Sequence, residues 1–194
     1  MSTTDPHARF VPTKRIIAAI DLAGFARAFQ RHDDAQMAAL LEEYYALCDA
    51  RLSAASGQII KFMGDGCLAV FPAEGAAVAL ESIIVLGSDV AALATRHGVD
   101  VVLGANVHLA SIIDGELGTG KHRRRDVIGR GVNQTYLLGR GPGVRISEPV
   151  YRSLPSAARS AWNKHKPPAI YHLTEPGEIL GGLGKDPAVN AARW

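Results

Sequence analysis

Cysteine is scarce in this sequence, and neither sign of charge dominates it. The 194 residues include two cysteines, Cys48 and Cys67, which lie in neither a metal-ligand nor a Cys-x-x-Cys spacing. We therefore expect two reduced, buried thiols. The formal net charge of +2 is too small to indicate a class of partner. The basic run at residues 121–125 is short and has no aromatic residue between its charges. We expect a solvated hairpin or a dimer contact there, and no nucleic-acid partner.

The chain also lacks a signal region and a long hydrophobic run. Residues 1–14 are polar and interrupted by proline. The longest uncharged run, residues 101–113, is too short to cross a membrane, and it contains Asn106 and His108. The histidines show no metal-ligand spacing, and no segment is repeated. We expect a cytoplasmic protein without a membrane span.

Length and composition favour one globular domain. The chain is 47% hydrophobic, and 194 residues are enough to bury a substantial core. We expect a flexible arm at residues 1–14, a single domain at 15–174 and a loosely packed tail at 175–194. A regulatory protein or domain, if there is one, is then expected to act in trans.

Hydrophobic periodicity and turn residues predict an α+β fold. The order of the predicted elements favours one sheet with helices on one face. The predicted strands lie at residues 15–20, in a hairpin at 57–71, and at 99–113, 126–128, 144–147 and 170–173. The predicted helices lie at residues 24–31, from 33 or 34 to about 52, and at 73–97, 130–138 and 148–154.

Two carboxylates stand where strands end. Asp21 follows the apolar run 16–20, which is typical of a buried central strand, and a helix starts soon after it. Asp65 lies between two glycines at the tip of the predicted hairpin. Two such carboxylates could hold a pair of hard cations. The alternative is a helix cap for Asp21 and a plain turn residue for Asp65.

Three motifs together resemble the catalytic domain of class III adenylate/guanylate cyclases. They are IDLAGF at residues 20–25, KFMGDG at 61–66 and DVIGRGVN at 126–133. The resemblance covers the chain from about residue 15 to residue 173. It implies a ferredoxin-like βαββαβ core with helices packed on a mainly antiparallel sheet.

The resemblance also implies an activity, which is conversion of ATP to cyclic AMP and pyrophosphate. Asp21 and Asp65 match the two metal-binding aspartates of the family, which hold two divalent cations, Mg²⁺ or Mn²⁺. The family places its sites at a homodimer interface, with the metal aspartates from one subunit and the base-recognising residues from the other.

Lys61 and Asp126 match the pair that recognises the base in adenylate cyclases. A Lys donor and an Asp acceptor fit the N1 acceptor and amino donor of adenine, whereas guanine presents the reverse pattern. Guanylate cyclases usually carry an acidic residue at the position of Lys61, so guanylate cyclase activity is disfavoured. The alternatives are a solvated charge for Lys61 and, for Asp126, a partner for the preceding arginines.

Further positions match the family's phosphate-binding groups. The backbone N–H groups of Leu22, Ala23, Gly24 and Phe25 match the stretch that holds the triphosphate, and the same residues would also suit an ordinary strand-to-helix turn.

A phosphate-binding lysine is expected near the last strand. Lys164 and Lys166 are the candidates, with a plain surface charge as the alternative for each.

Asn133 matches the asparagine that orients the ribose, with a helix-start residue as the alternative. One helical turn later the family has a transition-state arginine, but this chain has Leu137. Arg140 is the nearest candidate replacement if the helix continues, although Gly139 and Gly141 suggest that it ends. Leu137 leaves an alternative function open, a weakly active or catalytically silent cyclase-fold module that binds nucleotide or a partner and dimerises.

Overall fold

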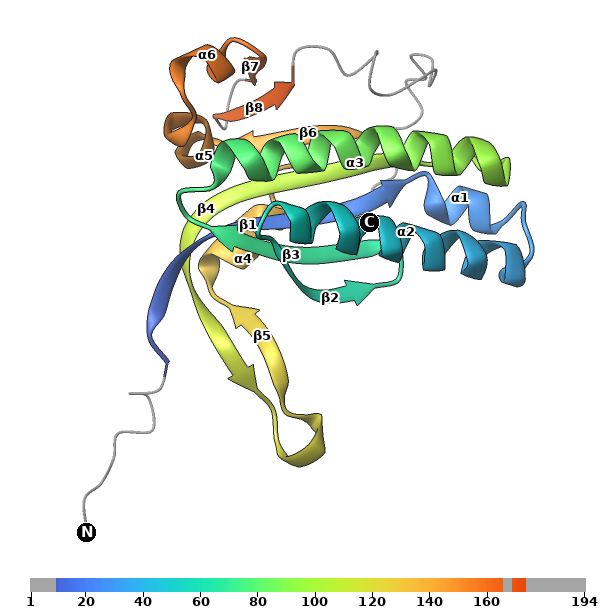
Figure 1. The fold of residues 1–194 in the computed structure, drawn as a ribbon, viewed down its shortest axis with the longest axis horizontal. Helices are drawn as coiled ribbons and strands as arrows, with labels where there is room; N and C mark the ends of the chain where they lie inside the picture. Colours follow the sequence, from blue (N-terminus) through green and yellow to red (C-terminus); the bar gives the residue numbers. More distant parts are fainter. Residues whose placement is uncertain (1–9, 166–168, 174–194) are drawn as a thin grey trace.

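One mixed sheet forms the centre of the computed structural model, which describes residues 10–165 and 169–173 (Figure 1). In this part of the chain the strand order is β2-β3-β1-β4-β6-β8-β7, and β5 pairs with β4. All pairings are antiparallel except that of β4 with β6. The strands are β1 (Pro12–Ala23), β2 (Gln58–Met63), β3 (Gly66–Pro72), β4 (Val102–Leu117), β5 (Arg124–Ile128), β6 (Gly143–Ser147), β7 (Trp162–His165) and β8 (Ile170–Leu173).

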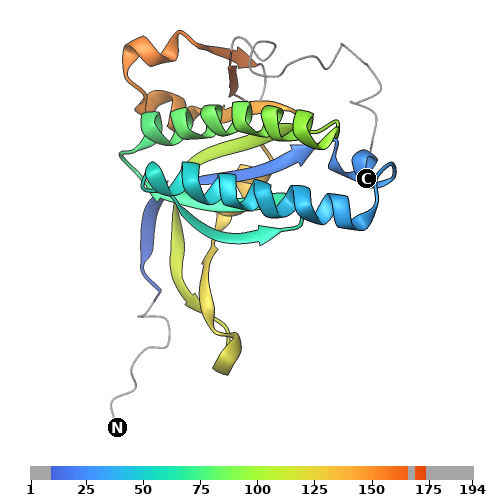
Figure 2. The same ribbon diagram turned by 45° about the vertical axis from the view of Figure 1, so that its right-hand side comes forward.

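Two long helices cover one face of this sheet, lying side by side (Figures 1 and 2). They are α2 and α3, and the core between them and the sheet includes Ile16 and Ile20 of β1. Ile17 points to the other face, where it packs with Val132 of α4. The expectation of helices on one face is therefore wrong for α4. The helices are α1 (Phe25–Phe29), α2 (Asp34–Ala54), α3 (Ala76–His97), α4 (Arg130–Tyr136), α5 (Glu148–Ser153) and α6 (Ser156–Arg159), with a 3-10 turn η1 (Gly120–His122).

The central strand β1 is longer than the sequence predicted. Residues 12–14, which we assigned to the arm, belong to β1 and pair with residues 111–113 of β4. Their polar side chains hid the strand because this end of β1 is largely exposed. Pro12 is tolerated as the first residue of the strand, where its missing N–H is least costly. The domain boundaries otherwise stay a prediction.

Strands β4 and β5 form a long hairpin that projects beyond the sheet (Figure 1). Their register runs from Ile113 opposite Ile128 to Leu117 opposite Arg124. The sequence predicted a shorter β5 because Arg124 and Arg125 belong to the basic run. The hairpin carries Asp126 on β5.

Helix α3 is apolar along much of its length. By length and composition it would be able to cross a membrane, and 44% of its most apolar window is buried inside the structure. Its buried residues, such as Ile83 and Leu86, belong to the main core. Both cysteines are free and buried, as expected.

Candidate functional site

Asp21 lies near the end of β1, directly opposite Gly104 of β4. A Cβ atom at position 104 would collide with the Asp21 carboxylate and would come within 2.6 Å of the Gly141 carbonyl oxygen. Glycine at this position therefore lets the carboxylate and the loop containing Gly141 both lie against β4.

Asp65 occupies the turn between β2 and β3 and lies beside Asp21. The backbone N–H groups of Asp65 itself and of Leu22, the residue after Asp21, favour the ionised form of its carboxyl group and act to lower its pKa. Asp21 as a whole residue is exposed, but its carboxylate lies against Gly104 of β4. Burial of the carboxyl group raises its pKa to about 6, with the charge of Asp65 as the second cause. Burial also raises the pKa of Asp65. The structure thus brings the two predicted metal ligands together.

This carboxylate pair suits hard divalent cations. Two like charges held together disfavour ionisation, and a bound cation would relieve that repulsion. Among the described residues, no cluster of three or more His, Cys, Asp or Glu side chains could hold a metal. Mg²⁺ is commonly bound by one or two carboxylates that leave the other positions to water and phosphate oxygens, so Asp21 and Asp65 fit such an ion.

The predicted strand-to-helix turn follows Asp21. Gly24 has a left-handed φ of 94°, and a Cβ there would lie 2.8 Å from the carbonyl oxygen of Asp100. Leu22 and Ala23 are still part of β1, and Phe25 is the first residue of α1. The structure thus places the four predicted phosphate-binding residues at the junction of β1 and α1.

A cavity of about 310 Å³ opens beside Asp21. Polar side chains reach it from β1, β4, the end of α4, the following loop and β6, namely Asp21, Asn106, Tyr136, Arg140 and Arg145. The cavity therefore has one carboxylate, that of Asp21, and two arginines among its lining residues.

Asn106 is buried at the wall of this cavity. Its Nδ2 donates to the carbonyl oxygen of Gly139 at 2.8 Å, while its Oδ1 is buried without a partner among the described residues. A buried acceptor left unpaired costs roughly 1–3 kcal/mol. A ligand with a hydrogen-bond donor would satisfy it.

Arg145 is the functional candidate that the sequence analysis missed. It is 7% exposed, and its guanidinium donates to four carbonyl oxygens, those of residues 140–143. Burial lowers its pKa, against the attraction of the nearby Asp21. The only signal in the sequence was a charged residue inside a short apolar strand, which does not reveal its partners.

The loop after α4 decides the position of Arg140. Helix α4 ends at Tyr136, with Leu137 as its C-cap, so it stops before Arg140, as Gly139 and Gly141 suggested. Arg140 consequently does not share a helix face with Asn133, and it lines the cavity with Asp21. The predicted helix at residues 130–138 was two residues too long.

Asn133 and Leu137 face away from this cavity. Asn133 is exposed, and Leu137 is 78% exposed. Neither residue lines the cavity. Helix α4 is held to the sheet by His108, whose Nε2 lies 3.2 Å from Gln134 Oε1. The face of α4 that carries Asn133 and Leu137 is therefore exposed to solvent and does not contribute to the cavity of its own chain.

Lys61 and Asp126 form an ion pair between β2 and β5. Lys61 Nζ donates to both Asp126 carboxylate oxygens, at 2.8 and 2.9 Å. Burial acts to raise the pKa of Asp126, but the hydrogen bonds from Lys61 and from the Val127 N–H outweigh it and lower this pKa. The structure thus joins the two residues predicted to recognise the base, although their strands do not pair through the backbone.

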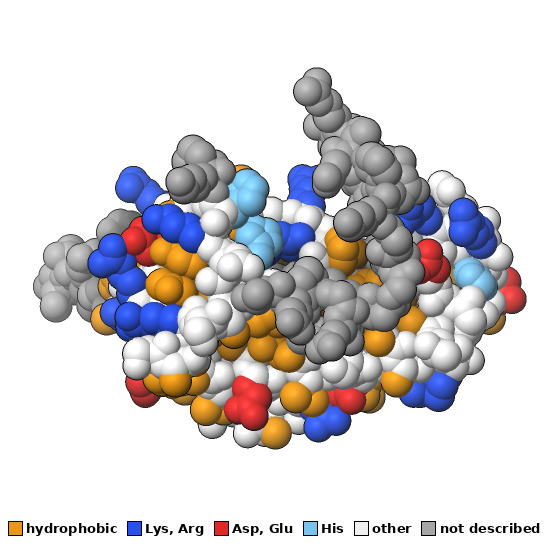
Figure 3. Space-filling model, turned by 90° about the horizontal axis from the view of Figure 1, so that it is seen from above, with side chains coloured by type: hydrophobic (Ala, Val, Ile, Leu, Met, Phe, Trp, Pro, Cys, Tyr) orange, Lys and Arg blue, Asp and Glu red, His pale blue; other side chains and the backbone are white. Residues whose placement is uncertain are grey.

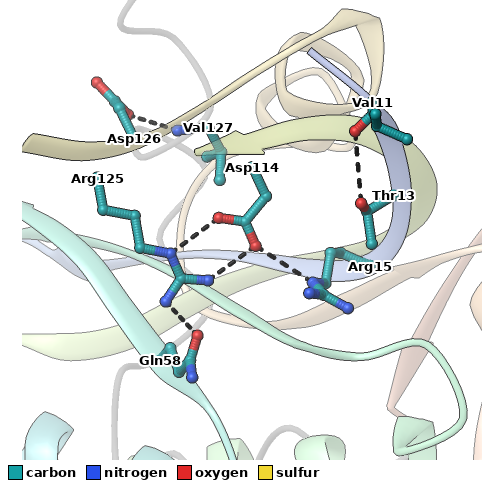
Figure 4. A network of polar contacts seen from close by, with 8 residues as sticks. All are labelled: Val11, Thr13, Arg15, Gln58, Asp114, Arg125, Asp126 and Val127. Atoms are coloured by element: carbon teal, nitrogen blue, oxygen red, sulfur yellow. Dashed lines mark hydrogen bonds and ion pairs between the residues drawn. The ribbon is translucent and has the colours of Figure 1, made fainter. Parts of the chain in front are cut away.

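A polar network holds β5 against its neighbours (Figure 4). Arg125 donates to both oxygens of Asp114, at 2.8 and 2.7 Å, and also to Gln58 of β2. Arg15 of β1 donates to Asp114 at 3.3 Å. Asp114 thereby ties β1, β4 and β5 together, and Arg125 links them to β2.

Lys164 lies apart from this site. It is exposed on β7, the strand at the other edge of the sheet from β2, and it does not line the cavity. Seen from above, Lys and Arg side chains lie toward both ends of the molecule (Figure 3). Its predicted phosphate contact gains no support within one subunit, and Lys166 lies outside the described residues.

The sheet order, the α2–α3 layer and the carboxylate pair define the fold of a class III nucleotidyl cyclase catalytic domain. The guanylyl cyclase Cya2 superposes with a TM-score of 0.74 at 18% identity, over 89% of this chain and 97% of that one. The adenylyl cyclase CyaB from P. aeruginosa gives 0.74 at 17%, over 88% and 98%. A bacterial light-regulated adenylyl cyclase gives 0.72 at 20%, and there the match spans 89% of this chain but 55% of the other.

No family model matches the chain, and no curated protein matches it in sequence. The fold similarity includes both adenylyl and guanylyl cyclases, so the choice of nucleotide depends on the residues of the site.

Proposed function

We propose that this protein is an adenylate cyclase that converts ATP to cyclic AMP and pyrophosphate in a homodimer. The observation that carries the proposal is the Lys61–Asp126 ion pair, because it stands in a cyclase fold that also brings Asp21 and Asp65 together. We further propose that the protein acts in the cytoplasm, under a regulator in trans.

Adenine would bind between Lys61 and Asp126. Lys61 would donate to N1, and Asp126 would accept from the exocyclic amino group. Guanine would place a donor against the lysine and an acceptor against the carboxylate, and such buried mismatches are strongly rejected. The ion pair holds both groups in place until the base arrives.

Asp21 and Asp65 would hold two cations, Mg²⁺ or Mn²⁺. When bound, these cations neutralise the polyphosphate and lower the pKa of the attacking 3′-hydroxyl. Asn133 would orient the ribose so that its 3′-oxygen lies in line with the α-phosphorus. The O3′–P bond then forms, the bond to the pyrophosphate oxygen breaks, and the hydroxyl proton is released.

Exposed apolar side chains support a homodimer with shared sites. Met63, Ile128, Tyr136 and Leu137 are 43%, 58%, 44% and 78% exposed. They belong to or follow β2, β5 and α4, which carry Lys61, Asp126 and Asn133 respectively. A second copy that covers this surface would bring its aspartates to those residues.

The test is cyclic nucleotide production by the purified protein, with ATP and with GTP, in Mn²⁺ and in Mg²⁺. We expect cyclic AMP from ATP, none from Asp65→Ala, and unchanged output from Asp49→Ala, an exposed aspartate on α2. Cyclic GMP as the main product would refute the adenine assignment.

A second candidate function is a silent or weak cyclase-fold module that binds nucleotide or a partner. The exposed Leu137 favours it, because the family has a transition-state arginine at that position. ATP binding without turnover in both metals would support this candidate over the enzyme.

A further inference from the structure

The loop at residues 139–143 is held rigidly against the cavity. Asn106 donates to the carbonyl oxygen of Gly139 at 2.8 Å, and the Arg145 guanidinium donates to the carbonyl oxygens of residues 140, 141, 142 and 143 at 2.6, 3.0, 2.9 and 3.4 Å. Every residue of the loop therefore has its carbonyl group fixed by a buried side chain.

Arginine is the residue that can make this arrangement. Its planar guanidinium presents five donors in a fixed fork, whereas lysine presents three from one point. A Cβ at position 139 would lie 2.8 Å from the Cδ of Arg145, so the loop packs directly on this side chain. The charge and the shape of Arg145 together fix the path of the loop.

The rigid loop carries Arg140 at the cavity. Arg140 lines the cavity together with Asp21 of the same chain. Among the described residues, no side-chain hydrogen bond or ion pair of Arg140 is formed. Its guanidinium donors are therefore free to bind an anionic ligand.

We propose that Arg140 binds the polyphosphate at the site built on Asp21 and Asp65 of its own subunit, and that Arg145 positions it through the loop. This inference rests on the proposed function. In the family arrangement an arginine at the position of Leu137 would supply the positive charge. Leu137 is exposed on α4 and does not line the cavity of its own chain, so an arginine there would serve a different site from Arg140. The guanidinium that contacts the phosphates would then come from the same subunit as the two aspartates.

The first test is binding of pyrophosphate, the leaving group, in the presence of Mg²⁺, measured by titration calorimetry. Arg140→Ala should weaken binding by about 10-fold or more, because a hydrogen bond to a charged group contributes roughly 1.5–3 kcal/mol. Arg140→Lys should lose less. Arg31→Ala, which removes an exposed arginine that does not line the cavity, should bind as the wild type does. Equal affinity of Arg140→Ala and wild type, at equal thermal stability, would overturn the proposal.

The second test separates action within a subunit from action across the dimer. Each mixture of two inactive variants is assayed for cyclic AMP. If Arg140 serves its own subunit's aspartates, Arg140→Ala mixed with Lys61→Glu forms dimers with one intact site, and mixed with Asp21→Ala it forms none. The first mixture should regain roughly a quarter of wild-type activity, because half of the dimers are mixed and each has one intact site of two.

The reverse pattern, rescue by Asp21→Ala and not by Lys61→Glu, would overturn the proposal. Asp21→Ala mixed with Lys61→Glu is the positive control for shared sites. If that control fails while Arg140→Ala still weakens pyrophosphate binding, the shared-site part of the proposed function is wrong and the assignment of Arg140 stands.

Arg145 acts through Arg140, and a double-mutant cycle tests this. Arg145→Lys keeps the charge near Asp21 but cannot hold four carbonyl groups, so it should weaken pyrophosphate binding about as much as Arg140→Ala does. In the Arg140→Ala background the same change should have no further effect, because the two residues act as one unit. Additive losses would show that Arg145 does not position Arg140.

Discussion

Asp114 offers a quantitative test of how the projecting hairpin is held to the sheet. Its side chain is 6% exposed, and it accepts from Arg125 at 2.8 and 2.7 Å and from Arg15 at 3.3 Å. Asp114→Asn removes the negative charge and leaves one carbonyl oxygen to face two guanidinium groups. The change keeps the size of the side chain, so its effect is electrostatic.

The expected loss lies between two limits. Breaking a fully buried ion pair costs roughly 3–5 kcal/mol, whereas an exposed pair contributes about 0–1 kcal/mol. The Arg15 and Arg125 side chains are 33% and 37% exposed, so solvent screens part of the interaction. We therefore expect Asp114→Asn to lower the free energy of unfolding by about 2 kcal/mol.

Urea unfolding at pH 7 and at equal protein concentration measures this loss. A slope of about 2 kcal/mol per molar urea would place the midpoint about 1 M lower than in the wild type. The control is Asp49→Asn, an exposed aspartate on α2, which should change the free energy by less than about 0.5 kcal/mol. A loss for Asp114→Asn no larger than that of the control would refute the proposed role of the network.

The pH dependence of this loss has a defined sign. Hydrogen bonds from Arg125 are the main cause that lowers the pKa of Asp114 below its ordinary value of 3.8. The carboxylate therefore stabilises the folded state fully above pH 3.8, and this contribution is lost as the pH falls through the lower pKa of the folded state. The difference between wild type and Asp114→Asn should shrink in that acidic range.

Three further predictions concern the candidate site. Lys61→Glu should lower kcat/KM for ATP by at least about 10²-fold with little change in thermal stability, and unchanged ATP kinetics would exclude base recognition. We expect Mn²⁺ to raise the Tm of the wild type, and Gly104→Ala should displace the Asp21 carboxylate and abolish that rise; an unaltered rise would refute the steric argument. Because the pKa of Asp21 is raised to about 6 in the folded state, metal-free protein should lose stability as the pH rises from about 4 to about 6, and Asp21→Asn should remove that slope in thermal melts.

The carboxylate pair was predictable because its determinants are local. An apolar strand ending at Asp21 and a Gly-Asp-Gly turn at Asp65 each fix one side chain, and the antiparallel pairing of β1 with β3 brings the two together. The Lys61–Asp126 pair required the resemblance to a family. Its two strands share no backbone pairing, and no periodicity indicates that side chains alone bridge them.

Arg145 contacts the loop residues just before it, but the position of this loop at the cavity was not predictable from local pattern. It depends on the parallel pairing of β4 with β6, which sets Asn106 opposite Arg145. Residues this far apart in sequence meet only through the whole sheet order. The opposite face occupied by α4 was missed for the same reason, since the apolar residue Val132 does not reveal which side of the sheet it covers.

The exposed Leu137 and the cavity-lining Arg140 both bear on which subunit supplies the positive charge at the phosphates. Phosphoryl transfer needs a cation near the phosphate oxygens, but electrostatic stabilisation depends on where the charge lies and not on which chain supplies it. Helix α4 ends before Arg140, and the loop that follows places Arg140 at the cavity beside Asp21 of its own chain. A chain with leucine on the exposed face of α4 and arginine in this loop would therefore keep the cation while changing the subunit that provides it.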